Sequence, residues 1–315
     1  ALEVSVFARA LHVTQPLAIQ TGEVRASTRL LFFGDAPPTH VEIAARDVRL
    51  PGGAALRGLQ ATVYGRFRPG GTQFDLREIT ATADAVSVAG AEAQSVAAQI
   101  FPRPLPRIDA AITARIFGAP LALRANTDLT ERSAHVRFTG EISPQVLDVI
   151  SARVGVNVRK YYEFDALTAE HGEASFAPGW KFERLRARVR IPRMNSYGVI
   201  MEDGRAEVEL EPGRFFSPDA FARIGENFAR GSYEHNLKTH QYRFLLDGRL
   251  RPLEISPWFR AWWPNFFRQL EFVTSPPEAS VDVAGFWRDG RRSSVFVFAD
   301  TEKSVLRGTE FDRVR

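Results

Sequence analysis

Leu185-Arg186-Ala187-Arg188-Val189-Arg190-Ile191 is the stretch that decides the fold. Apolar residues occupy its odd positions and three arginines occupy its even positions. Because successive side chains of a β-strand point to opposite faces, this alternation predicts a strand with one apolar and one charged face. Such a strand belongs to a sheet that meets apolar surroundings on one side and solvent on the other.

Several other stretches repeat this alternation. Residues 205–210 have the same pattern with acidic partners, so pairing with residues 185–191 would place arginine opposite glutamate and favour the pair modestly. Similar alternation predicts strands at residues 41–43, 61–64, 73–76, 108–113, 136–138, 242–246, 279–283 and 294–298. The sequence therefore predicts a mainly β fold, a curved antiparallel sheet of repeated strand-turn-strand units.

The composition is that of a folded protein with unusually many phenylalanines. The chain has 315 residues, of which 44% are hydrophobic and 25% charged, so wholesale disorder is not expected. Phe occurs 24 times, against 6 Tyr and 5 Trp. Phe suits strands and carries no polar tip, so many strand faces should contact something dry.

Charge and cysteine content exclude several function classes. The net charge is +4, but arginines alternate with acidic residues instead of clustering, so we expect no nucleic-acid partner. The absence of cysteine excludes thiolate chemistry, Cys-ligated zinc and disulfides. No run of about 18 apolar residues exists, so no membrane-spanning helix is expected. The chain starts at Ala1 without Met or a signal peptide, and we interpret it as a piece of a longer polypeptide.

Three Ser-Pro pairs predict helix starts, at Ser143-Pro144, Ser217-Pro218 and Ser256-Pro257. Serine caps a free backbone N–H, and proline fits the first helical position, where no N–H is needed. Apolar residues with helical spacing follow the first two pairs, at Leu147, Ile150 and Val154, and at Phe221, Ile224 and Phe228.

A tryptophan cluster follows the third pair, at Trp258, Trp262 and Trp263. It has three interpretations: core packing beneath a helix, an anchor at a lipid interface, or a contact for a partner protein.

The chain also contains two similar segments, which we call the predicted echo, and a proline-rich connection. Residues 129–147 and 237–259 share the order strand, polar turn, strand and Ser-Pro helix, which suggests a repeat. Prolines alternate through residues 101–106 and favour an extended segment. We therefore expect an N-terminal β segment over residues 1–105 and a repeated β segment with short helices over residues 106–315, or one continuous sheet.

A search for catalytic constellations found none. The six histidines are scattered, and no phosphate loop, dinucleotide fingerprint or nucleophile elbow occurs. Glu170, His171 and Glu173 are interpreted as part of a polar loop, and Asp203-Gly204 and Asp289-Gly290 as hairpin turns. The sequence therefore predicts no enzyme, no catalytic residue, no metal, no cofactor and no small-molecule substrate. An enzyme on a β-scaffold would instead require paired carboxylates in a cleft.

Residues 164–315 resemble the AsmA-like proteins of Gram-negative bacteria, which belong with the bridge-like lipid-transfer proteins. Three segments carry the resemblance, residues 231–239, 242–248 and 305–311. The resemblance implies a groove-like or taco-like β-sheet in the periplasm, whose parent chain is anchored in the inner membrane. It also implies phospholipid transport or outer-membrane and envelope assembly, with lipid acyl chains and envelope or membrane proteins as partners.

On this basis we expect an apolar groove that shelters acyl chains. Its candidate lining residues are Leu185, Val189, Ile191, Val208, Leu210, Phe244 and Leu246. Trp258, Trp262 and Trp263 are the candidate interface residues. The competing hypothesis is a structural or interaction module with a closed β core, in which the helices cover the sheet and no ligand binds.

Overall fold

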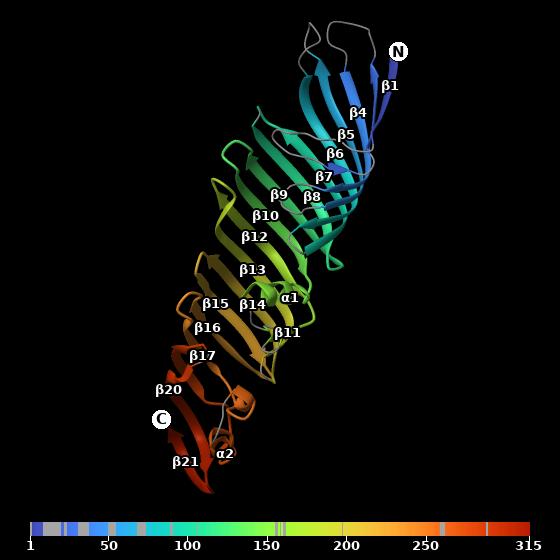
Figure 1. Ribbon diagram of the computed structural model, residues 1–315. Helices are drawn as coiled ribbons and strands as arrows, with labels where there is room; N and C mark the ends of the chain where they lie inside the picture. Colours follow the sequence, from blue (N-terminus) through green and yellow to red (C-terminus); the bar gives the residue numbers. More distant parts are fainter. Residues whose placement is uncertain are drawn as a thin grey trace. The chain divides into compact units, whose positions relative to one another are not determined.

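The computed structural model describes residues 2–8, 20–21, 24–30, 38–49, 55–67, 74–88, 91–104, 106–154, 157, 159, 162–196, 198–258, 262–287 and 289–315. The chain is mainly β. Its antiparallel strands form open, curved sheet structure, and a few short helices accompany them (Figure 1). The predicted fold class is confirmed. The chain forms two units, Ala1–Ser143 with Ser175–Lys181, and Pro144–Ala174 with Phe182–Arg315.

The first unit is a meander in which each strand from β3 to β10 pairs with the next. In addition, β1 pairs with β3, and β2 with the end of β4. The strands are β1 (Leu2–Ala8), β2 (Gln20–Thr21), β3 (Val24–Leu30), β4 (Pro38–Arg49), β5 (Ala55–Phe67), β6 (Phe74–Val88), β7 (Ala91–Pro102), β8 (Arg107–Ile116), β9 (Ala119–Asp128) and β10 (Ser133–Ile142).

The strand register of this unit aligns apolar residues across neighbouring strands. Because directly opposed residues share a face, one row of apolar side chains crosses the strands from β4 to β10. It consists of Val41, Val63, Ile79, Ile100, Ala110, Ala125 and Val136. On the other face, Asp109 accepts hydrogen bonds from Asn126 and Arg103, which lower its pKa.

The second unit contains the remaining strands and the helices. They are α1 (Val146–Val154), β11 (Tyr162–Phe164), β12 (Leu167–Ala177), β13 (Lys181–Ser196), β14 (Val199–Glu211), β15 (Arg214–Ile224), β16 (Asn227–Asn236), β17 (Gln241–Arg249), η2 (Ser256–Trp258), α2 (Trp263–Phe267), β18 (Leu270–Phe272), β19 (Glu278–Phe286), β20 (Asp289–Leu306) and β21 (Thr309–Val314). The last residues of β12 belong to the first unit. No helix in the described ranges is long and apolar enough to cross a membrane.

The pairing that the sequence analysis considered for residues 185–191 and 205–210 is present in the structure. In β13 and β14, Leu185 lies opposite Leu210, and Arg186 lies opposite Glu209. Arg186 Nε is 3.0 Å from Glu209, and a guanidinium nitrogen of Arg188 is 2.7 Å from Glu207. Arg190, the third arginine of the stretch, lies opposite Arg205, so the expected charge complementarity holds for two of the three arginines.

One of the three predicted helix starts is wrong. Ser217-Pro218 lies inside β15, where the pairing with β16 shifts between Ser217 and Ala220. This bulge accommodates Pro218, which has no N–H to donate to a neighbouring strand. Phe221 and Phe228 stack with ring centroids 6.1 Å apart on one face of the sheet instead of lining a helix.

The other two Ser-Pro pairs precede helical structure, as predicted. After Ser143-Pro144 the helix α1 begins at Val146, and Ser256-Pro257 opens the short 3-10 helix η2. Both follow a hairpin whose turn has the same hydrogen bonding. Asp128 Oδ1 accepts the N–H groups of the residues two and three positions ahead, and Asn236 Oδ1 does the same. The predicted echo between residues 129–147 and 237–259 therefore has a local structural basis.

Ser217 offers a test of the bulge. Its side chain is buried, and its hydroxyl donates a hydrogen bond of 2.7 Å to the backbone carbonyl of Glu207 on β14. Ser217→Ala leaves that carbonyl with one partner fewer, so we expect a loss of about 1 kcal/mol in the free energy of unfolding. Urea titration followed by circular dichroism measures the loss; an unchanged midpoint would contradict the assigned role.

Three local predictions need correction or relocation. Glu170, His171 and Glu173 belong to strand β12 and not to a loop. Asp203-Gly204 lies within β14, where Asp203 has a φ of 50° and both Glu202 and Asp203 reach Arg223, so it marks an irregularity and not a turn. Asp289-Gly290 directly follows the β19–β20 turn, because Phe286 and Asp289 are paired.

The proline-rich residues 101–106 connect β7 to β8. Phe101 on β7 lies opposite Asp109 on β8, so the two strands pair up to this connection. The predicted boundary after residue 105 falls in this turn, inside the first unit.

Candidate functional site

The apolar face of the second unit is the candidate site, and we call it the inner face. The β13–β14 register places Leu185, Val189 and Ile191 on the same face as Leu210 and Val208. Phe244 and Leu246 on β17 lie opposite Tyr233 and Gly231 on β16, and opposite Val283 and Val281 on β19. All seven predicted lining residues therefore belong to strand faces of apolar character; whether they bind lipid remains a prediction.

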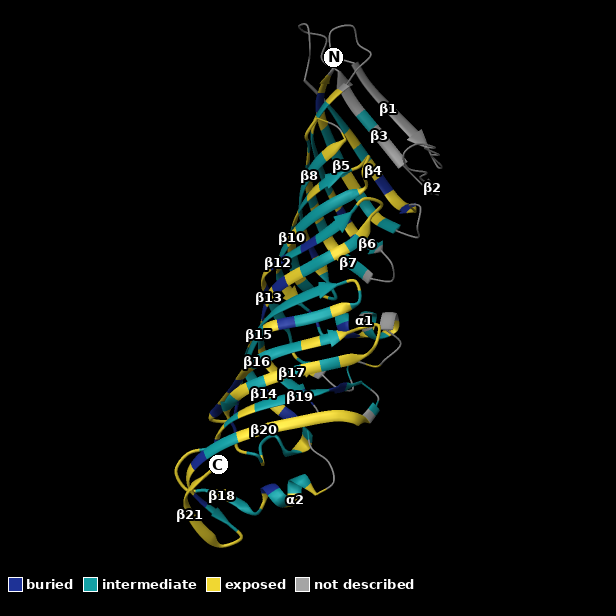
Figure 2. Ribbon diagram, turned by 90° about the vertical axis from the view of Figure 1, so that its left-hand side faces the viewer, coloured by how far each residue is buried: buried dark blue, intermediate teal, exposed yellow. Residues whose placement is uncertain are grey.

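Most of the inner face is only half-buried (Figure 2). Among the seven predicted lining residues, only Val189 is buried, and the other six are intermediate. Half of the buried hydrophobic residues in the described part of the chain are alanines, and Phe267 is the one aromatic residue among them. A closed core of this size would bury its large side chains, so much of the apolar surface lacks a covering layer.

One end of the inner face is covered by the segment that includes η2. A small core forms there from Val199, Met201, Ile224, Ala229 and Leu250. Trp258 packs against this core, and its Nε1–H donates a 2.8 Å hydrogen bond to the carbonyl of Ser196. Of the three interpretations given to the tryptophans, core packing describes Trp258.

The other two tryptophans lie at α2 in a different environment. Their rings stack with centroids 4.3 Å apart, and Trp263 also contacts Phe267, which is buried. Trp262 is 57% exposed and Trp263 is half-buried. An exposed aromatic side chain beside a buried one fits an interface better than a closed core, so the interface hypothesis continues only for Trp262 and Trp263.

An aromatic cluster that the sequence analysis missed lies on the inner face near the β16–β17 turn. His235 lies opposite Phe215 on β15 and Tyr242 on β17, and its ring centroid is 5.9 Å from that of Trp287. Trp287 Nε1 donates a 2.9 Å hydrogen bond to the Tyr233 hydroxyl. The alternation at Tyr233, His235 and Tyr242 is the sequence signal, but the position of Trp287 depends on the β19–β20 hairpin.

His235 makes the stability of this cluster depend on pH. Burial lowers the pKa of His235, nearby His240 adds to the effect, and its Nε2 has no hydrogen-bond partner. The unfolded chain therefore binds a proton more readily, so the contribution to stability is complete above about pH 6.5 and is lost as the pH falls below it. We expect the melting temperature to fall between about pH 7.5 and pH 5.5, and His235→Gln to reduce that slope. A slope unchanged by His235→Gln would contradict this prediction.

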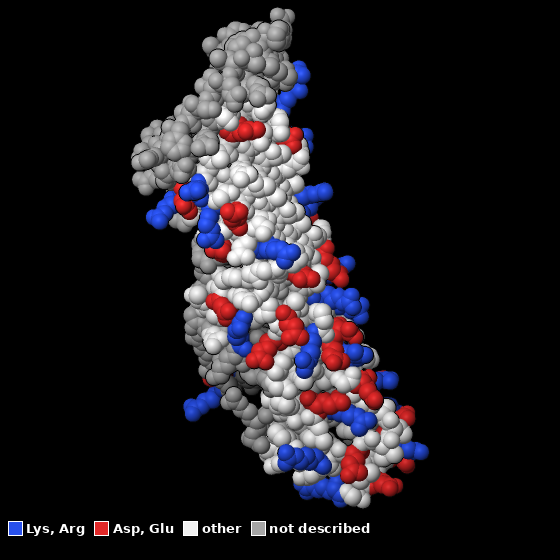
Figure 3. Space-filling model, turned by 90° about the vertical axis from the view of Figure 1, so that its right-hand side faces the viewer, with Lys and Arg blue, Asp and Glu red and all other residues white. Residues whose placement is uncertain are grey.

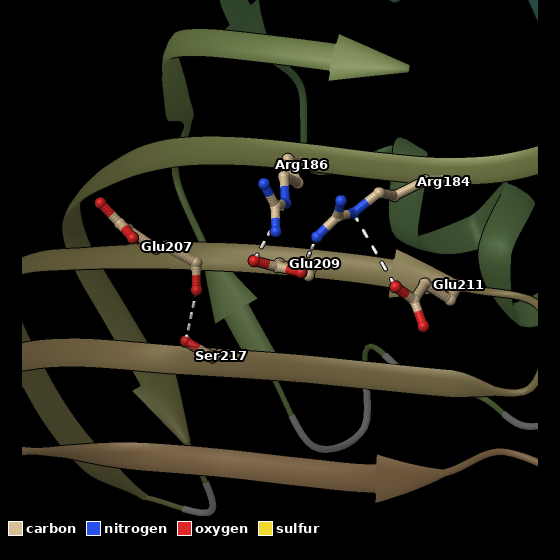
Figure 4. A network of polar contacts seen from close by, with 6 residues as sticks. All are labelled: Arg184, Arg186, Glu207, Glu209, Glu211 and Ser217. Atoms are coloured by element: carbon tan, nitrogen blue, oxygen red, sulfur yellow. Dashed lines mark hydrogen bonds and ion pairs between the residues drawn. The ribbon is translucent and has the colours of Figure 1, made fainter. Parts of the chain in front are cut away.

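The opposite, outer face carries alternating charges. On the side drawn in Figure 3, basic and acidic side chains are interspersed over the surface that is not grey. Figure 4 shows one network, in which Arg184 and Arg186 both contact Glu209, and Arg184 Nε also lies 3.8 Å from Glu211. Hydrogen bonds from Arg243 to Asp282 lower the pKa of that carboxyl group. Exposed pairs of this kind contribute little stability each but keep this face hydrated.

The described residues contain no group of three or more His, Cys, Asp or Glu side chains able to hold a metal ion. The candidate triplet on β12 brings His171 Nε2 within 3.4 Å of Glu173 on an exposed strand surface.

Comparison with protein-family models, with curated proteins and with solved structures found no match to this chain. The described inner face offers apolar contact, with an aromatic and histidine cluster at one side.

Proposed function

We propose that the chain is a non-enzymatic β-groove segment whose inner face shelters lipid acyl chains. The carrying observation is the apolar inner face, on which large side chains such as Phe244, Leu185 and Leu210 are only half-buried in the described structure. An apolar surface of this kind in water favours an apolar ligand, at about 25 cal/mol per Å² buried. The charged outer face provides the hydrated side that such a segment needs.

The cellular setting of the proposal follows from the resemblance to AsmA-like proteins. It places the segment in the periplasm of a Gram-negative bacterium, within a parent chain anchored in the inner membrane. The role is phospholipid transport, or outer-membrane and envelope assembly, with lipid and envelope or membrane proteins as partners. The proposed chemistry needs no cofactor, metal or nucleic acid.

A second candidate function is a structural or interaction module without a ligand. Its supporting observation is the small core around Trp258, where residues 250–258 cover one end of the inner face. In this case the protein's own segments would cover the whole inner face, as residues 250–258 cover one end of it. No apolar surface would then be left for a ligand to bind.

Native mass spectrometry of the 315-residue chain, purified without strong detergent, tests the first proposal against the second. We expect mass adducts that match phospholipids and that disappear after extraction with organic solvent. Adding phosphatidylethanolamine vesicles to the extracted protein should restore them. A spectrum without adducts, both before and after incubation with the vesicles, would contradict the lipid proposal.

A further inference from the structure

The inner face of the second unit has two different edges. The turns that join β14 to β15, β16 to β17, and β19 to β20 lie along one of them, which we call the turn edge (Figure 1). Backbone hydrogen bonds link these turns, from the N–H of Leu237 to the carbonyl of Gly213 and from the N–H of Trp287 to the carbonyl of His240. The small core around Trp258 lies at the opposite ends of the strands, so it closes the inner face at the other edge.

The side chains of the inner face change in polarity along the strands. At the turn edge, the neighbouring strands β16 and β17 place His235 opposite Tyr242, and Trp287 contacts both rings. Farther from the turns, the same two strands carry Gly231 opposite Leu246. Tyr, Trp and His have an apolar body and a polar tip, which suits a boundary between apolar groups and water. The inner face therefore changes from polar-tipped to apolar with distance from the turn edge.

Two hydroxyl groups converge at the turn edge. A Cβ atom built on Gly285 would lie 3.0 Å from Tyr242 Oη and 2.5 Å from Ser293 Oγ, so both hydroxyls lie over this glycine. Neither has a hydrogen-bond partner among the residues that the structure describes. In the adjacent β16–β17 turn, the exposed Lys238 has no ion-pair partner in the described part of the chain. Hydroxyl and ammonium groups are donors suited to ester and phosphate oxygens.

We propose that a phospholipid binds the inner face in one orientation, with its phosphate and glycerol ester groups at the turn edge. Its acyl chains run from there toward the core around Val199 and Leu250. Tyr242 and Ser293 donate hydrogen bonds to the ester or phosphate oxygens, and Lys238 supplies a positive charge at the same edge. This orientation presupposes the proposed lipid binding. The reverse orientation would place the phosphate against apolar side chains without hydrogen-bond donors, which is costly.

Fluorescence quenching by nitroxide-labelled lipid tests the orientation. The chain has no cysteine, so Thr239→Cys and Glu226→Cys each introduce a single thiol for a fluorescent label. Both positions are exposed, in the turns at the two ends of β16, about 30 Å apart. The labelled chains are incubated with vesicles of phosphatidylcholine that carries a nitroxide on its choline group, and are then separated from the vesicles.

We expect this headgroup nitroxide to quench the label at residue 239 several-fold more than the label at residue 226. A nitroxide at the end of an acyl chain should quench residue 239 less than the headgroup nitroxide does. Equal quenching at both residues, or stronger headgroup quenching at residue 226, would overturn the orientation. Native mass spectrometry of the same samples separates the two possible failures. Lipid adducts without the expected quenching reject the orientation alone, whereas a chain without adducts rejects the proposed lipid binding and the orientation with it.

The two hydroxyls are tested by conservative substitutions with a matched control. Tyr242→Phe and Ser293→Ala each remove one hydroxyl from the inner face, whereas Ser294→Ala removes one from the outer face of the same strand. Native mass spectrometry over a series of phosphatidylethanolamine vesicle concentrations measures half-saturation. We expect each inner-face variant to need about fivefold more lipid, and Ser294→Ala to need no more than the natural chain. Unchanged half-saturation in both inner-face variants, with the fold confirmed by circular dichroism, would overturn the assignment of the hydroxyls.

Discussion

Gly231→Ala is expected to cost about 3 kcal/mol or more in the free energy of unfolding, enough to unfold a marginal sheet. Gly231 on β16 lies directly opposite Leu246 on β17. A Cβ atom built there would sit 1.9 Å from the carbonyl oxygen of Leu245, which is backbone and part of the strand pairing. Relief therefore requires the two strands to separate, and urea unfolding followed by circular dichroism measures the cost.

Gly308→Ala is the control for this substitution. Gly308 lies in the turn between β20 and β21, where an added Cβ meets nothing within 4 Å but the φ is +80°. The expected loss in the free energy of unfolding comes only from placing alanine in this left-handed backbone conformation, and is about 1–2 kcal/mol. Equal costs at the two glycines would contradict the claim that close strand approach makes Gly231 necessary.

Phe244→Asp is expected to remove co-purified lipid while the chain stays folded. Phe244 is half-buried on the inner face between Tyr233 and Val283, so the carboxylate can reach water if the face is open. A charge among the acyl chains would then cost several kcal/mol of binding, and the phospholipid adducts should be lost. Native mass spectrometry reports the adducts, and circular dichroism reports the fold.

Phe228→Asp is the matched control on the outer face. Phe228 is exposed and lies opposite Arg223 and Arg249, so an aspartate there gains two cationic neighbours. We expect this variant to keep both the fold and the lipid. If Phe244→Asp unfolds the chain while Phe228→Asp does not, the inner face is a closed core and the second candidate function is favoured.

The strand alternation allowed the fold class and the strand faces to be predicted from the sequence. The pairing of residues 185–191 with 205–210 was favoured by charge complementarity, because arginine recurs with period two on the first stretch and glutamate on the second. Ser217-Pro218 was mispredicted because serine and proline favour a helix start and a bulge for related reasons. In each, one backbone N–H is missing from the regular hydrogen bonding, and only the neighbouring strands decide between them.

The candidate site was predictable in part. Periodicity assigned Val208 and Leu246 to an apolar face, but it does not report whether another layer covers that face. The different environments of Trp258 and Trp262 depend on contacts far apart in the sequence, such as the hydrogen bond from Trp258 to Ser196. The cluster around His235 likewise needs the β19–β20 hairpin, whose position cannot be obtained from local pattern.

The meander described for β3 to β10 makes the sheet a nearly one-dimensional array. Each strand there is bonded to the strands before and after it in sequence, so ordering one strand creates the template for the next. In such arrays, stability is approximately a sum over neighbouring elements, and folding can propagate from any stable hairpin. Duplication or deletion of a hairpin by recombination would therefore change the number of strands that the apolar row crosses. The pairing within each remaining strand pair would stay the same.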